Sequence, residues 1–500
     1  MEYVATNVGS RSIDRYLMDE VGIDGIVLME CAARAVADAV LRQSGSIAVL
    51  IGGGNNGGDG LALMRILKLL GRDSLGILCC DEKKFSGDAL KNYEIAVKIG
   101  LSLTHDIERL RDKNIIVDAI FGTGLDRNIE GTAYRAIQLA NESSAYRIAV
   151  DIPSGINGDT GAIMGIVFRA DETITVQCIK RGMLLTPERE AVGKLSVCKI
   201  GIIPQHETEW LCDGELIDED YVRSQLPDRR TVSNKGTYGR SLIIGGSSGM
   251  SGAAVMAATA ALRAGSGLVN ACVPKEIVGA FQVRPEIMAD SDADSDINTL
   301  IEKASSIAVG CGSRFDQHIK EKLTAALASG KPCVIDADGL NNLDSASMEL
   351  LHENCILTPH PLEFARLLGC GINHVLRDPV GISKTFSQKH RCTLLLKSAT
   401  TVIASPSGKL RYNISGNPGL AKGGSGDVLT GIITALLAQK LTAFDAACVG
   451  AFLLGSSADK ALELLGNRAL IAEDVIDAVA LCIGNNCFVN FFRRSDYEST

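Results

Sequence analysis

Apolar residues in the first half of the chain form short, uninterrupted runs, and amphipathic segments separate these runs. Uninterrupted runs predict strands that are buried on both faces of a parallel sheet. The amphipathic segments, such as residues 59–71, predict helices, and a longer helical segment over residues 12–43 precedes the first strand. The five predicted strands are SIAVLIGG (46–53), SLGILCC (74–80), NIIVDAIFGTG (114–124), RIAVDIPSG (147–155) and ETITVQCI (172–179). This alternation predicts a doubly wound, Rossmann-like α/β domain.

A second series of apolar runs starts at residue 241, after a polar break near residues 204–237 in which no strand pattern occurs. The break predicts a boundary close to residue 215, and hence two domains, 1–214 and 215–500. The second series ends in a glycine-rich turn that leads into an apolar helix, and no element is assigned to residues 489–500. Its predicted strands are SLIIGG (241–246), LVNACVP (268–274), SIAVGCG (306–312), PCVIDADGL (332–340), CILTPH (355–360) and CTLLLKSATTVIASP (392–406).

The composition is that of a globular protein in water, with 46% hydrophobic and 22% charged residues and a net charge of -9. This charge gives no reason to expect a nucleic-acid partner. The 15 cysteines include no Cys-x-x-Cys pair, and the N-terminus lacks the regions of a secretory signal. The uncharged run 241–262 has the Gly and Ser content of a strand, a turn and a buried helix. We therefore expect a cytoplasmic protein with reduced cysteines and no membrane partner. A homo-oligomer is also expected, although the sequence does not fix the oligomeric state.

Polar residues follow three of the predicted strands of the first half, where the strands end. Ligands of open parallel sheets bind beyond the carboxyl ends of the strands, so these side chains should converge. Carboxylates, amide oxygens and a hydroxyl together suit a metal-like cation and acid/base chemistry. The residues are Asn55, Asn56, Asp59, Asp118, Asp151 and Ser154.

The glycine spacing Gly52-x-Gly54-x-x-Gly57 also fits a phosphate-binding loop, and an NAD-dependent dehydrogenase is the competing interpretation. That interpretation requires an acidic residue about twenty positions further on, and Asp81 lies somewhat beyond this spacing. A single Asp after a strand can also serve only as a turn former or a helix cap.

A second anion site is predicted where the turn Gly423–Gly426 precedes a helix that begins near Asp427. Backbone N–H groups at such a helix start can hold a phosphate, and Asp427 could take a proton from an attacking alcohol. The chain has no Gly-x-x-x-x-Gly-Lys-[Ser/Thr] motif, so this is not a P-loop. The alternative is a cap that stabilises the helix by about 1 kcal/mol.

The motifs GGGNNGGDG, VDAIFGTG and VDIPSG resemble the N-terminal, epimerase domain of the NAD(P)H-hydrate repair enzymes, although Cys31 departs from the usual pattern. The resemblance implies that Asn56, Asp118 and Ser154 hold a potassium ion. It implies Asp151 as the first choice for the group that moves the proton, and Asp126 as the second. The implied contacts to the hydrated dinucleotide are Asn55, Asn56, Gly57, Gly58, Asp59, Gly122, Thr123, Gly124, Leu125, Asp126, Arg127, Asn128 and Asp151.

The motifs NKGTYGRSLIIGGSSGMSGAA, VIDADGLN, LTPHPLEFARLLG and GLAKGGSGDVL resemble the ribokinase-like dehydratase domain of the same family; the departures include Leu362 and the turn KSATT. The resemblance implies Asp427 as general base, ADP or ATP as phosphoryl donor, and Mg²⁺. His360 is then a substrate contact, and Glu363 belongs to a helix start rather than to a metal site. The implied hydrate contacts are Ala253, Gly312, His360 and Asp427, and the nucleotide contacts are Lys397, Ser398, Ala399, Thr400, Thr401 and Gly426.

The function that this resemblance implies is the repair of hydrated NADH and NADPH. The first domain would interconvert the R and S hydrates, and the second would dehydrate the S hydrate at the expense of a nucleotide. The alternative is a ribokinase-like kinase for a vitamin precursor, with the first domain as a nucleotide-binding scaffold. The sequence leaves open the choice of donor, the preference for NADH or NADPH hydrate, and the identity of the epimerase base.

Overall fold

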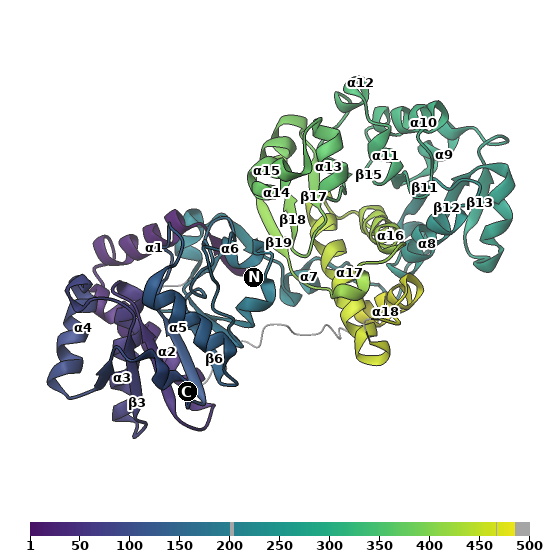
Figure 1. The fold of residues 1–500 in the computed structure, drawn as a ribbon. Coiled ribbons are helices and arrows are strands. Elements are labelled where there is room, and N and C mark those ends of the chain that lie inside the picture. The colour runs from purple at the N-terminus through teal and green to yellow at the C-terminus, as the bar shows by residue number, and fades with distance from the viewer. Residues whose placement is uncertain (201–204, 467, 486–500) are drawn as a thin grey trace. The chain divides into compact units, whose positions relative to one another are not determined.

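Residues 1–200, 205–466 and 468–485 are described by a computed structural model, in which the chain divides into two α/β units (Figure 1). The N-terminal unit comprises residues 2–215, and the C-terminal unit comprises Met1 and the described residues from 216 to 485. Cys487 and the segment 489–500 lie outside the described residues.

The N-terminal unit is built on a sheet of seven parallel strands in the order β4-β3-β2-β5-β6-β7-β9, which confirms the predicted doubly wound sheet. Strands β2 and β5 pair at its centre, with Leu50 opposite Asp118. The chain leaves β2 toward β4 and returns to β5 on the other side, and ligands bind at such a reversal. The strands are β2 (Ile47–Ile51), β3 (Ser74–Leu78), β4 (Ser102–Thr104), β5 (Ile115–Ala119), β6 (Tyr146–Val150), β7 (Glu172–Val176) and β9 (Lys194–Cys198).

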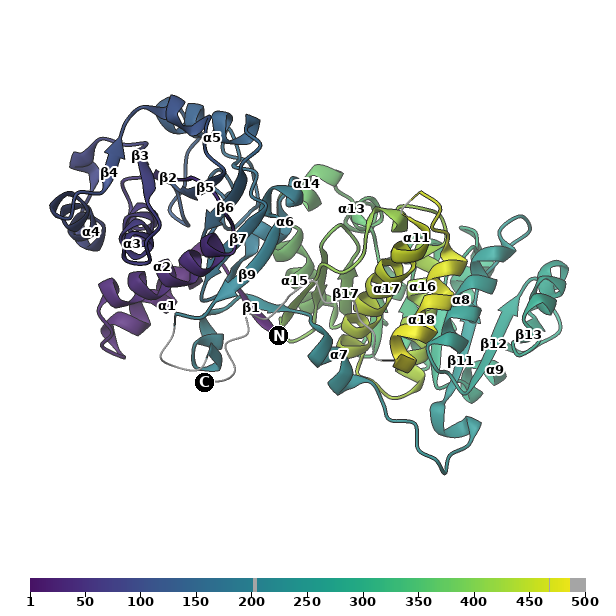
Figure 2. The ribbon, with the colours of Figure 1, turned by 90° about the horizontal axis from the view of Figure 1, so that it is seen from below.

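Helices cover both faces of this sheet (Figure 2). Alternate residues of β2 point to opposite faces of the sheet. Val49 and Ile51 belong to one apolar cluster, and Ala48 and Leu50 belong to another. Helices α2 and α3 belong to the first cluster and α5 to the second. The helices of this unit are α1 (Asn7–Asp19), α2 (Gly25–Leu41), α3 (Asn55–Leu69), α4 (Gly87–Lys98), α5 (Gly131–Glu142) and α6 (Arg181–Leu185).

Three local predictions require correction. The segment 12–43 is not one helix, because α1 and α2 are separate and Gly22 between them has a left-handed φ of 83°. Helix α3 begins at Asn55 rather than at residue 59, since Gly57 and Gly58 are tolerated inside it by close packing. The break at 204–237 does hold a short strand, β10 (Gly214–Leu216), and also the helix α7 (Glu219–Gln225). Neither element forms an apolar run in the sequence of this break, so neither was predicted.

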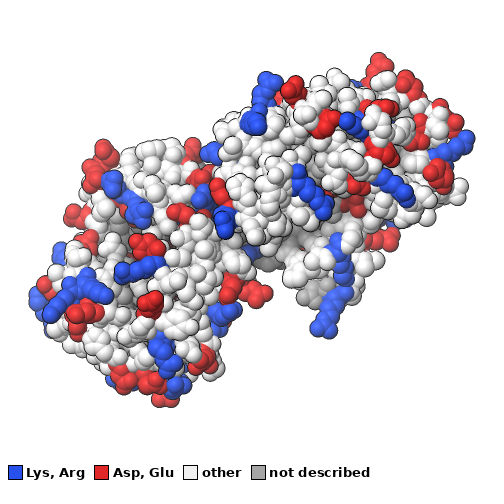
Figure 3. All heavy atoms as spheres, turned by 45° about the horizontal axis from the view of Figure 1, so that its top comes forward, with Lys and Arg blue, Asp and Glu red and all other residues white. Residues whose placement is uncertain are grey.

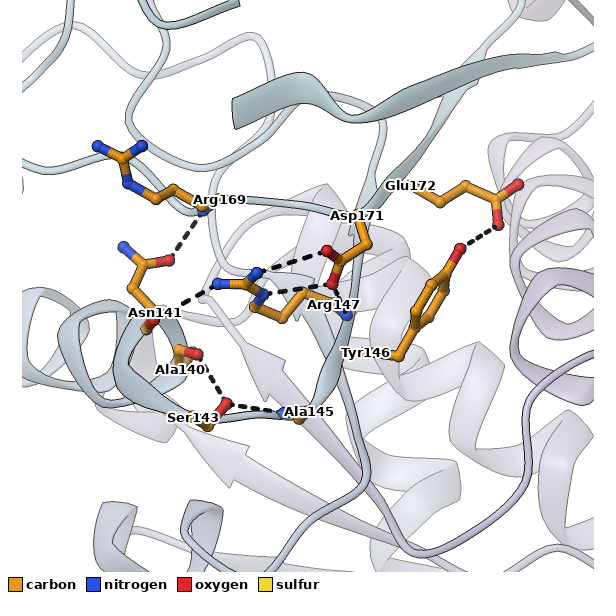
Figure 4. Close-up of polar contacts among 9 residues, drawn as sticks. All are labelled: Ala140, Asn141, Ser143, Ala145, Tyr146, Arg147, Arg169, Asp171 and Glu172. Atoms are coloured by element: carbon orange, nitrogen blue, oxygen red, sulfur yellow. Dashed lines mark hydrogen bonds and ion pairs between the residues drawn. The ribbon is translucent and has the colours of Figure 1, made fainter. Parts of the chain in front are cut away.

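Strand β6, which Asp151 directly follows, is anchored at its opposite end by a polar network (Figure 4). The backbone N–H of Arg147 donates to Asp171 at 2.8 Å, and its guanidinium lies 3.3 Å from the same carboxylate. The hydroxyl of Tyr146 donates to Glu172 at 3.3 Å. These contacts tie β6 to the start of β7 and thereby fix the strand that carries Asp151.

The C-terminal unit holds nine strands in the order β13-β12-β11-β14-β15-β16-β17-β18-β19. The strands from β13 to β17 are parallel, and β18 and β19 add antiparallel pairs at one end. Of these nine strands, β11 comes first along the chain. The chain runs from β11 through β12 to β13 on one side and then returns to place β14 on the other side of β11, a reversal like that between β4 and β5 in the N-terminal unit. The strands are β11 (Arg240–Ile244), β12 (Leu268–Val273), β13 (Met288–Ser291), β14 (Ser306–Val309), β15 (Cys333–Ile335), β16 (Cys355–Leu357), β17 (Thr393–Leu396), β18 (Thr401–Ala404) and β19 (Leu410–Asn413).

One face of this sheet packs against α8, α16, α17 and α18, which share one large apolar cluster with the central strands (Figure 2). Residues 241–262 form β11, a turn and most of α8, as the sequence predicts. The helices are α8 (Ser251–Arg263), α9 (Ile297–Lys303), α10 (Gln317–Ala328), α11 (Asp338–Asn341), α12 (Ser345–Met348), α13 (Pro361–Leu368), α14 (Ile372–Arg377), α15 (Pro379–His390), α16 (Ser425–Ala438), α17 (Ala443–Leu465) and α18 (Ala472–Asn485).

The surface and the cysteines agree with the composition. On the face drawn in Figure 3, acidic and basic side chains are interspersed rather than gathered by sign. The 14 cysteines that the structure describes are all free thiols. Within the described ranges, no helix is both long enough and apolar enough to cross a bilayer.

Candidate functional site

The glycine-rich turn after β2 lets two backbones approach one another closely at the sheet centre. A Cβ atom on Gly52 would lie 1.9 Å from the carbonyl oxygen of Ile120, and one on Gly57 would lie 1.8 Å from that of Gly52. Only glycine fits both positions. The turn therefore brings the start of α3, with its unbonded backbone N–H groups, against the end of β5.

A buried cluster of polar side chains lies next to this turn and consists of Asn56, Asp118 and Ser154. The hydroxyl of Ser154 donates to Asp118 at 2.7 Å, and its backbone N–H donates to the other carboxylate oxygen at 2.7 Å. Burial raises the pKa of Asp118 to about 6, although these hydrogen bonds lower it. The side-chain oxygen and nitrogen of Asn56 are buried, and neither has a hydrogen-bond partner. An orphaned amide oxygen is costly to bury and marks a place for a cation or a ligand.

Asp151 follows β6 in a left-handed backbone conformation, with a φ of 68°. Non-glycine residues adopt this conformation only where the surrounding structure enforces it. Its carboxylate accepts the N–H of Val176 at 3.1 Å and forms an ion pair with Lys180. Lys180 is 1% exposed and also donates to the carbonyl of Val176 at 2.8 Å. Burial alone lowers the pKa of Lys180, but the charge of Asp151 raises it above its usual value.

Two further carboxyl groups, Asp14 on α1 and Asp59 on α3, line the same cavity as Asp151 and Lys180. Burial raises the pKa of Asp14 to about 6; Lys180 opposes this shift and Asp151 adds to it. Burial, together with the charges of Asp151 and Asp14, holds the pKa of Asp59 well above its usual range. The cavity therefore combines one carboxylate held by a lysine with two carboxyls that retain protons more readily.

Two neighbouring cavities open at this end of the sheet. The first has a volume of about 450 Å³ and contains the carboxyl cluster. The second has a volume of about 810 Å³, and its lining includes the cationic side chains of Lys84 and Arg127. The wall between them is shared, and it consists of Gly53, Gly54, Ile120, Phe121 and Leu125.

In the C-terminal unit, α16 begins at Ser425, two residues before Asp427, and follows Gly424 with its left-handed φ of 102°. A Cβ atom on Gly424 would lie 2.9 Å from Ala472 and from the sulfur of Met256. Glycine is therefore required where the chain turns into the helix. The turn leaves the first N–H groups of a 14-residue helix at the carboxyl ends of the strands.

Asp427 lies in the first turn of α16, beside a buried ion pair. The ammonium of Lys397 is 2.8 Å from the carboxylate of Asp336, and a Cβ atom on Gly426 would be 3.5 Å from each of them. Burial raises the pKa of Asp427 to about 6; the charge of Asp336 adds to this shift, whereas Cys311 and Lys397 oppose it. A carboxylate with this pKa can accept a proton near neutral pH.

His360 caps α13 through its Nδ1 atom, which accepts the N–H groups of Leu362 and Glu363 at 3.2 Å each. The carboxylate of Glu363 accepts the N–H of His360 at 2.8 Å in return, so Glu363 does belong to a helix start. Because Nδ1 accepts, the neutral ring carries its proton on Nε2, which lies 3.4 Å from the other carboxylate oxygen of Glu363.

The comparisons with known proteins cover both units. A family profile described as "YjeF-related protein N-terminus" matches residues 25–182, and one described as "NAD(P)H-hydrate dehydratase" matches residues 241–480. The "Bifunctional NAD(P)H-hydrate repair enzyme Nnr" of Moorella thermoacetica is 36% identical over 97% of both chains. The protein of the same name from Escherichia coli is 36% identical over 86% of this chain and 84% of its own.

The chain belongs to the bifunctional NAD(P)H-hydrate repair enzymes. It therefore combines an NAD(P)H-hydrate epimerase, an isomerase, with a nucleotide-dependent NAD(P)H-hydrate dehydratase, a lyase. The structure of a ribokinase-like superfamily protein from Enterococcus faecalis covers 55% of this chain and 96% of its own, with 25% identity and a TM-score of 0.51. The resemblance that the motifs carried is thus confirmed, together with the ribokinase-like fold of the second unit.

In the epimerase half, the structure gathers most of the expected contact residues around the two cavities, but not all of them. Among the described residues that line either cavity, Gly57, Gly58 and Asp126 do not occur. Gly57 and Gly58 pack inside α3 against Gly52 and Met29, and Asp126 is exposed. Those that do line a cavity are Asn55, Asn56, Asp59, Gly122, Thr123, Gly124, Leu125, Arg127, Asn128 and Asp151.

In the dehydratase half, the expected residues lie along the carboxyl ends of neighbouring strands. Gly312 follows β14, and a Cβ atom on it would be 2.7 Å from Ala253. Lys397 follows β17, and its backbone N–H donates to the carbonyl of Pro359, next to His360. Thr400 is buried within the turn that joins β17 to β18, whereas Ser398 and Ala399 are exposed on it.

The sequence analysis missed four residues that the structure brings to these sites: Asp14, Lys180, Asp336 and Cys311. Asp336 had a usable signal, because it directly follows a buried strand as Asp151 does, whereas Asp118 lies within β5. Asp14 had none, because it lies in the helical segment before the first predicted strand. Lys180 directly follows the predicted strand 172–179, but a lysine at that place does not by itself indicate burial against a carboxylate. Only the tertiary fold brings α1 and the end of β8 (Ile179–Lys180) to the cavity.

Proposed function

We propose that residues 1–214 form the epimerase domain and residues 215–500 the dehydratase domain, and that each has its own active site at the sheet edge described above. The epimerase site would interconvert the R and S hydrates of NADH and NADPH. The dehydratase site would phosphorylate the S hydrate and release NADH or NADPH. The proposal is supported by two separate carboxyl-bearing sites, one in each unit.

In the epimerase site, we assign the role of base to Asp151. Its carboxylate lines the cavity and lies against the ammonium of Lys180, and a carboxylate placed there can act as a proton acceptor. Asp14, whose pKa is raised to about 6 by burial, can supply a proton to the hydroxyl of the hydrate. Asp126, the second choice on sequence grounds, is exposed and is not assigned a role in proton transfer.

The residues expected to hold potassium fit such an ion. Asn56 offers a buried amide oxygen that has no partner, and Asp118 and Ser154 offer further oxygens beside the same turn. Oxygen ligands of mixed charge suit a hard monovalent cation, whose positive charge would favour the binding of anionic groups of the substrate. These three side chains would hold it.

The substrate is a dinucleotide, and the two adjoining cavities match its two halves. The cavity of about 450 Å³ holds the groups that can move protons, and we assign the hydrated nicotinamide half to it. The cavity of about 810 Å³ would take the adenosine half, with Lys84 and Arg127 near its phosphates. The shared wall contains Gly53 and Gly54, where backbone N–H groups can approach the pyrophosphate.

In the dehydratase site, Asp427 would take the proton of the substrate hydroxyl. The hydroxyl oxygen then bonds to the terminal phosphorus of the nucleotide, and the bond from that phosphorus to the departing nucleotide breaks. Phosphate is a better leaving group than hydroxide, and the lone pair of the ring nitrogen helps to expel it. Loss of a proton from the neighbouring ring carbon restores NADH or NADPH.

The remaining assignments in this half concern binding. The backbone N–H groups at the start of α16, including that of Gly426, would hold the transferred phosphate. The turn from Lys397 to Thr401 would contact the AMP portion of the nucleotide, and Ala253, Gly312 and the Nε2–H of His360 would contact the hydrate. Bound Mg²⁺ would neutralise charge on the nucleotide phosphates. We propose ADP as the donor, because fusion of both domains resembles the ADP-using arrangement.

The observation that carries this proposal is the position of Asp427, with its raised pKa, in the phosphate-binding turn of α16. The test is recovery of NAD(P)H absorbance from a mixture of R and S hydrates, with Mg²⁺ and K⁺ and with either ADP or ATP. Recovery beyond the S fraction, faster than spontaneous epimerisation, requires both activities. Recovery that stops at the S fraction would remove the epimerase assignment. No recovery with either nucleotide would remove the dehydratase assignment.

The competing interpretation, a vitamin-precursor kinase with a scaffold domain, is set aside by the match over both units. It would reappear only if a stable phosphorylated product accumulated in this assay. A reducing, cytoplasmic location is supported by the free thiols of the described cysteines. The homo-oligomer expected from the sequence stays a prediction, and light scattering on the purified protein tests it.

A further inference from the structure

An ion pair whose acidic partner has no role in the proposed reaction lies beside Asp427. Asp336 directly follows β15 and is buried, and its Oδ1 atom is 2.8 Å from the ammonium of Lys397, which directly follows β17. Its Oδ2 atom accepts the hydroxyl of Thr430 at 2.9 Å. Thr430 lies one turn beyond Asp427 on α16, so Asp336 connects the lysine to the helix that carries the proposed base.

The backbone around Asp336 is held in an unusual conformation. The next residue, Ala337, has a left-handed φ of 49°, although it is not glycine. A Cβ atom on Gly310 would lie 1.9 Å from the carbonyl oxygen of Asp336, so the β14 turn packs tightly over it. Such a conformation persists only where the surrounding contacts enforce it. The carboxylate of Asp336 is therefore held in a fixed position and does not move with Lys397.

Few other groups can influence the charge of Asp427. The thiol of Cys311 hydrogen-bonds to it from the turn after β14. The neighbouring helix α8 carries no titratable side chain before Arg263. Glu363 lies near Lys397 and adds to the negative charge around it. Charged groups on α17 and α18 have other partners: Asp445 has Tyr221, Asp459 has Asn417, Lys460 has Glu463, Glu473 has Arg284, Asp474 has Ile471 and Asp477 has Arg263.

We propose that Asp336 and Lys397 are positioning residues of the dehydratase step, which act through Asp427. The carboxylate of Asp336 pairs with the ammonium of Lys397, so that the lysine does not become the ion-pair partner of Asp427. Asp427 then remains available to the hydroxyl of the substrate. This inference rests on the proposed function of Asp427 as general base.

The carboxylates of Asp336 and Asp427 compete for one cation, the ammonium of Lys397. An ion pair with a lysine lowers the pKa of a carboxyl group and makes its carboxylate a weaker base. With Asp336 present, burial and the charge of Asp336 raise the pKa of Asp427 to about 6, and Lys397 offsets only part of this rise. Without Asp336, the carboxylate of Asp427 becomes the neighbour that Lys397 can neutralise.

The two partners of the pair should therefore shift the pH dependence of the dehydratase in opposite directions. In Asp336→Asn, the acidic limb of kcat/KM for NAD(P)H recovery should move to lower pH by about 1 unit, with a rate at neutral pH about tenfold lower. In Lys397→Met, the limb should move to higher pH. In the double variant it should return close to that of the unchanged protein.

Two matched variants separate charge from packing. Lys397→Arg keeps the positive charge, and its acidic limb should stay in place even if its rate falls. Thr430→Val removes one hydrogen bond to Asp336 without a change of charge, and it should also leave the limb in place. If Asp336→Asn does not fold, a shift to higher pH in Lys397→Met with no shift in Lys397→Arg still tests the inference.

Limbs that move in the same direction in Asp336→Asn and Lys397→Met, or that do not move, would overturn the inference. A purely structural role lowers the rate at every pH and leaves the limb where it was. Failure of the proposed function is a separate result, because the unchanged protein would then show no nucleotide-dependent recovery at all.

Discussion

The ammonium group of Lys180 lies against the carboxylate of Asp151 in the epimerase cavity, and the lysine is 1% exposed. Each charge compensates the other, since both are removed from most of the water. Removal of one partner leaves an uncompensated buried charge, which costs about 3–5 kcal/mol. The same pair would hold the carboxylate of Asp151 in place as the base of the epimerase. Stability and epimerisation therefore depend on one contact.

Lys180→Met should lower the free energy of unfolding by about 3–5 kcal/mol and abolish epimerisation, with dehydration of the S hydrate unchanged. Urea unfolding and the two separate assays measure these effects. The double variant Lys180→Met/Asp151→Asn is the matched control, because it carries no buried charge at this position. It should regain most of the stability and none of the epimerisation. Epimerisation at the normal rate in Lys180→Met would contradict the assignment of Asp151.

Asn56 gives a test of the potassium site that does not depend on activity. An ion that binds only the folded state stabilises it, so K⁺ should raise the Tm of the unchanged protein. Asn56→Ala removes the unpartnered amide oxygen and should abolish this rise. Asn55→Ala, at the exposed neighbouring position, should keep it. Equal responses to K⁺ in all three proteins would exclude Asn56 as a ligand.

The fold and the loops that carry the sites could be predicted from the sequence because they rest on local signals. Continuous apolar runs marked the buried strands, and glycines marked the turns after β2 and before α16. The start of α3 was misplaced by four residues, because Gly57 and Gly58 oppose helix formation unless tertiary packing requires them. Strand β10 was missed because it has only three residues, Gly214, Glu215 and Leu216, and therefore forms no apolar run.

The side chains that tune the sites could not be predicted in the same way. Lys180 sits between a short strand and a short helix, and only the fold shows that it is buried against Asp151. Asp336 carried the same signal as Asp151, a carboxylate directly after an apolar strand. Its role depends on Lys397, which is 61 residues further along the chain. Contacts of this kind depend on which strands become neighbours.

Asp427→Asn should lower nucleotide-dependent recovery of NAD(P)H by about 10²–10⁴-fold, the usual contribution of a general base. Epimerisation should be unchanged, since the two sites lie in different units. Assays with pure S hydrate and with pure R hydrate distinguish the two activities in one preparation. Loss of both activities in a folded variant would refute the two-site arrangement.

The same substitution should stabilise the protein near neutral pH. The pKa of Asp427 is raised from 3.8 to about 6 in the folded state, so the folded state binds its proton more tightly than the unfolded state does. The stabilisation from this group is complete below about pH 4 and is lost as the pH rises through about 6. Relative to the unchanged protein, Asp427→Asn should therefore gain about 1–2 kcal/mol between about pH 4 and 7, after allowance for partial exposure. Urea unfolding across this range tests the sign, and a relative gain on acidification would contradict it.

Lys84 offers a test of the second cavity as the site of the adenosine half. It lines that cavity, whereas Lys83, its neighbour on the same short turn, does not, and both are exposed. The hydrate of NADPH carries one more phosphate than that of NADH, so loss of a cation beside it should weaken its binding more. In epimerisation assays, Lys84→Gln should raise the KM for NADPH hydrate by about fivefold, equivalent to about 1 kcal/mol, and that for NADH hydrate by less. Lys83→Gln should change neither constant, and added salt should reduce the difference, because exposed charges are screened. If the two lysine variants behave alike, the adenosine half does not bind in this cavity, and only the assignment of the nicotinamide half remains.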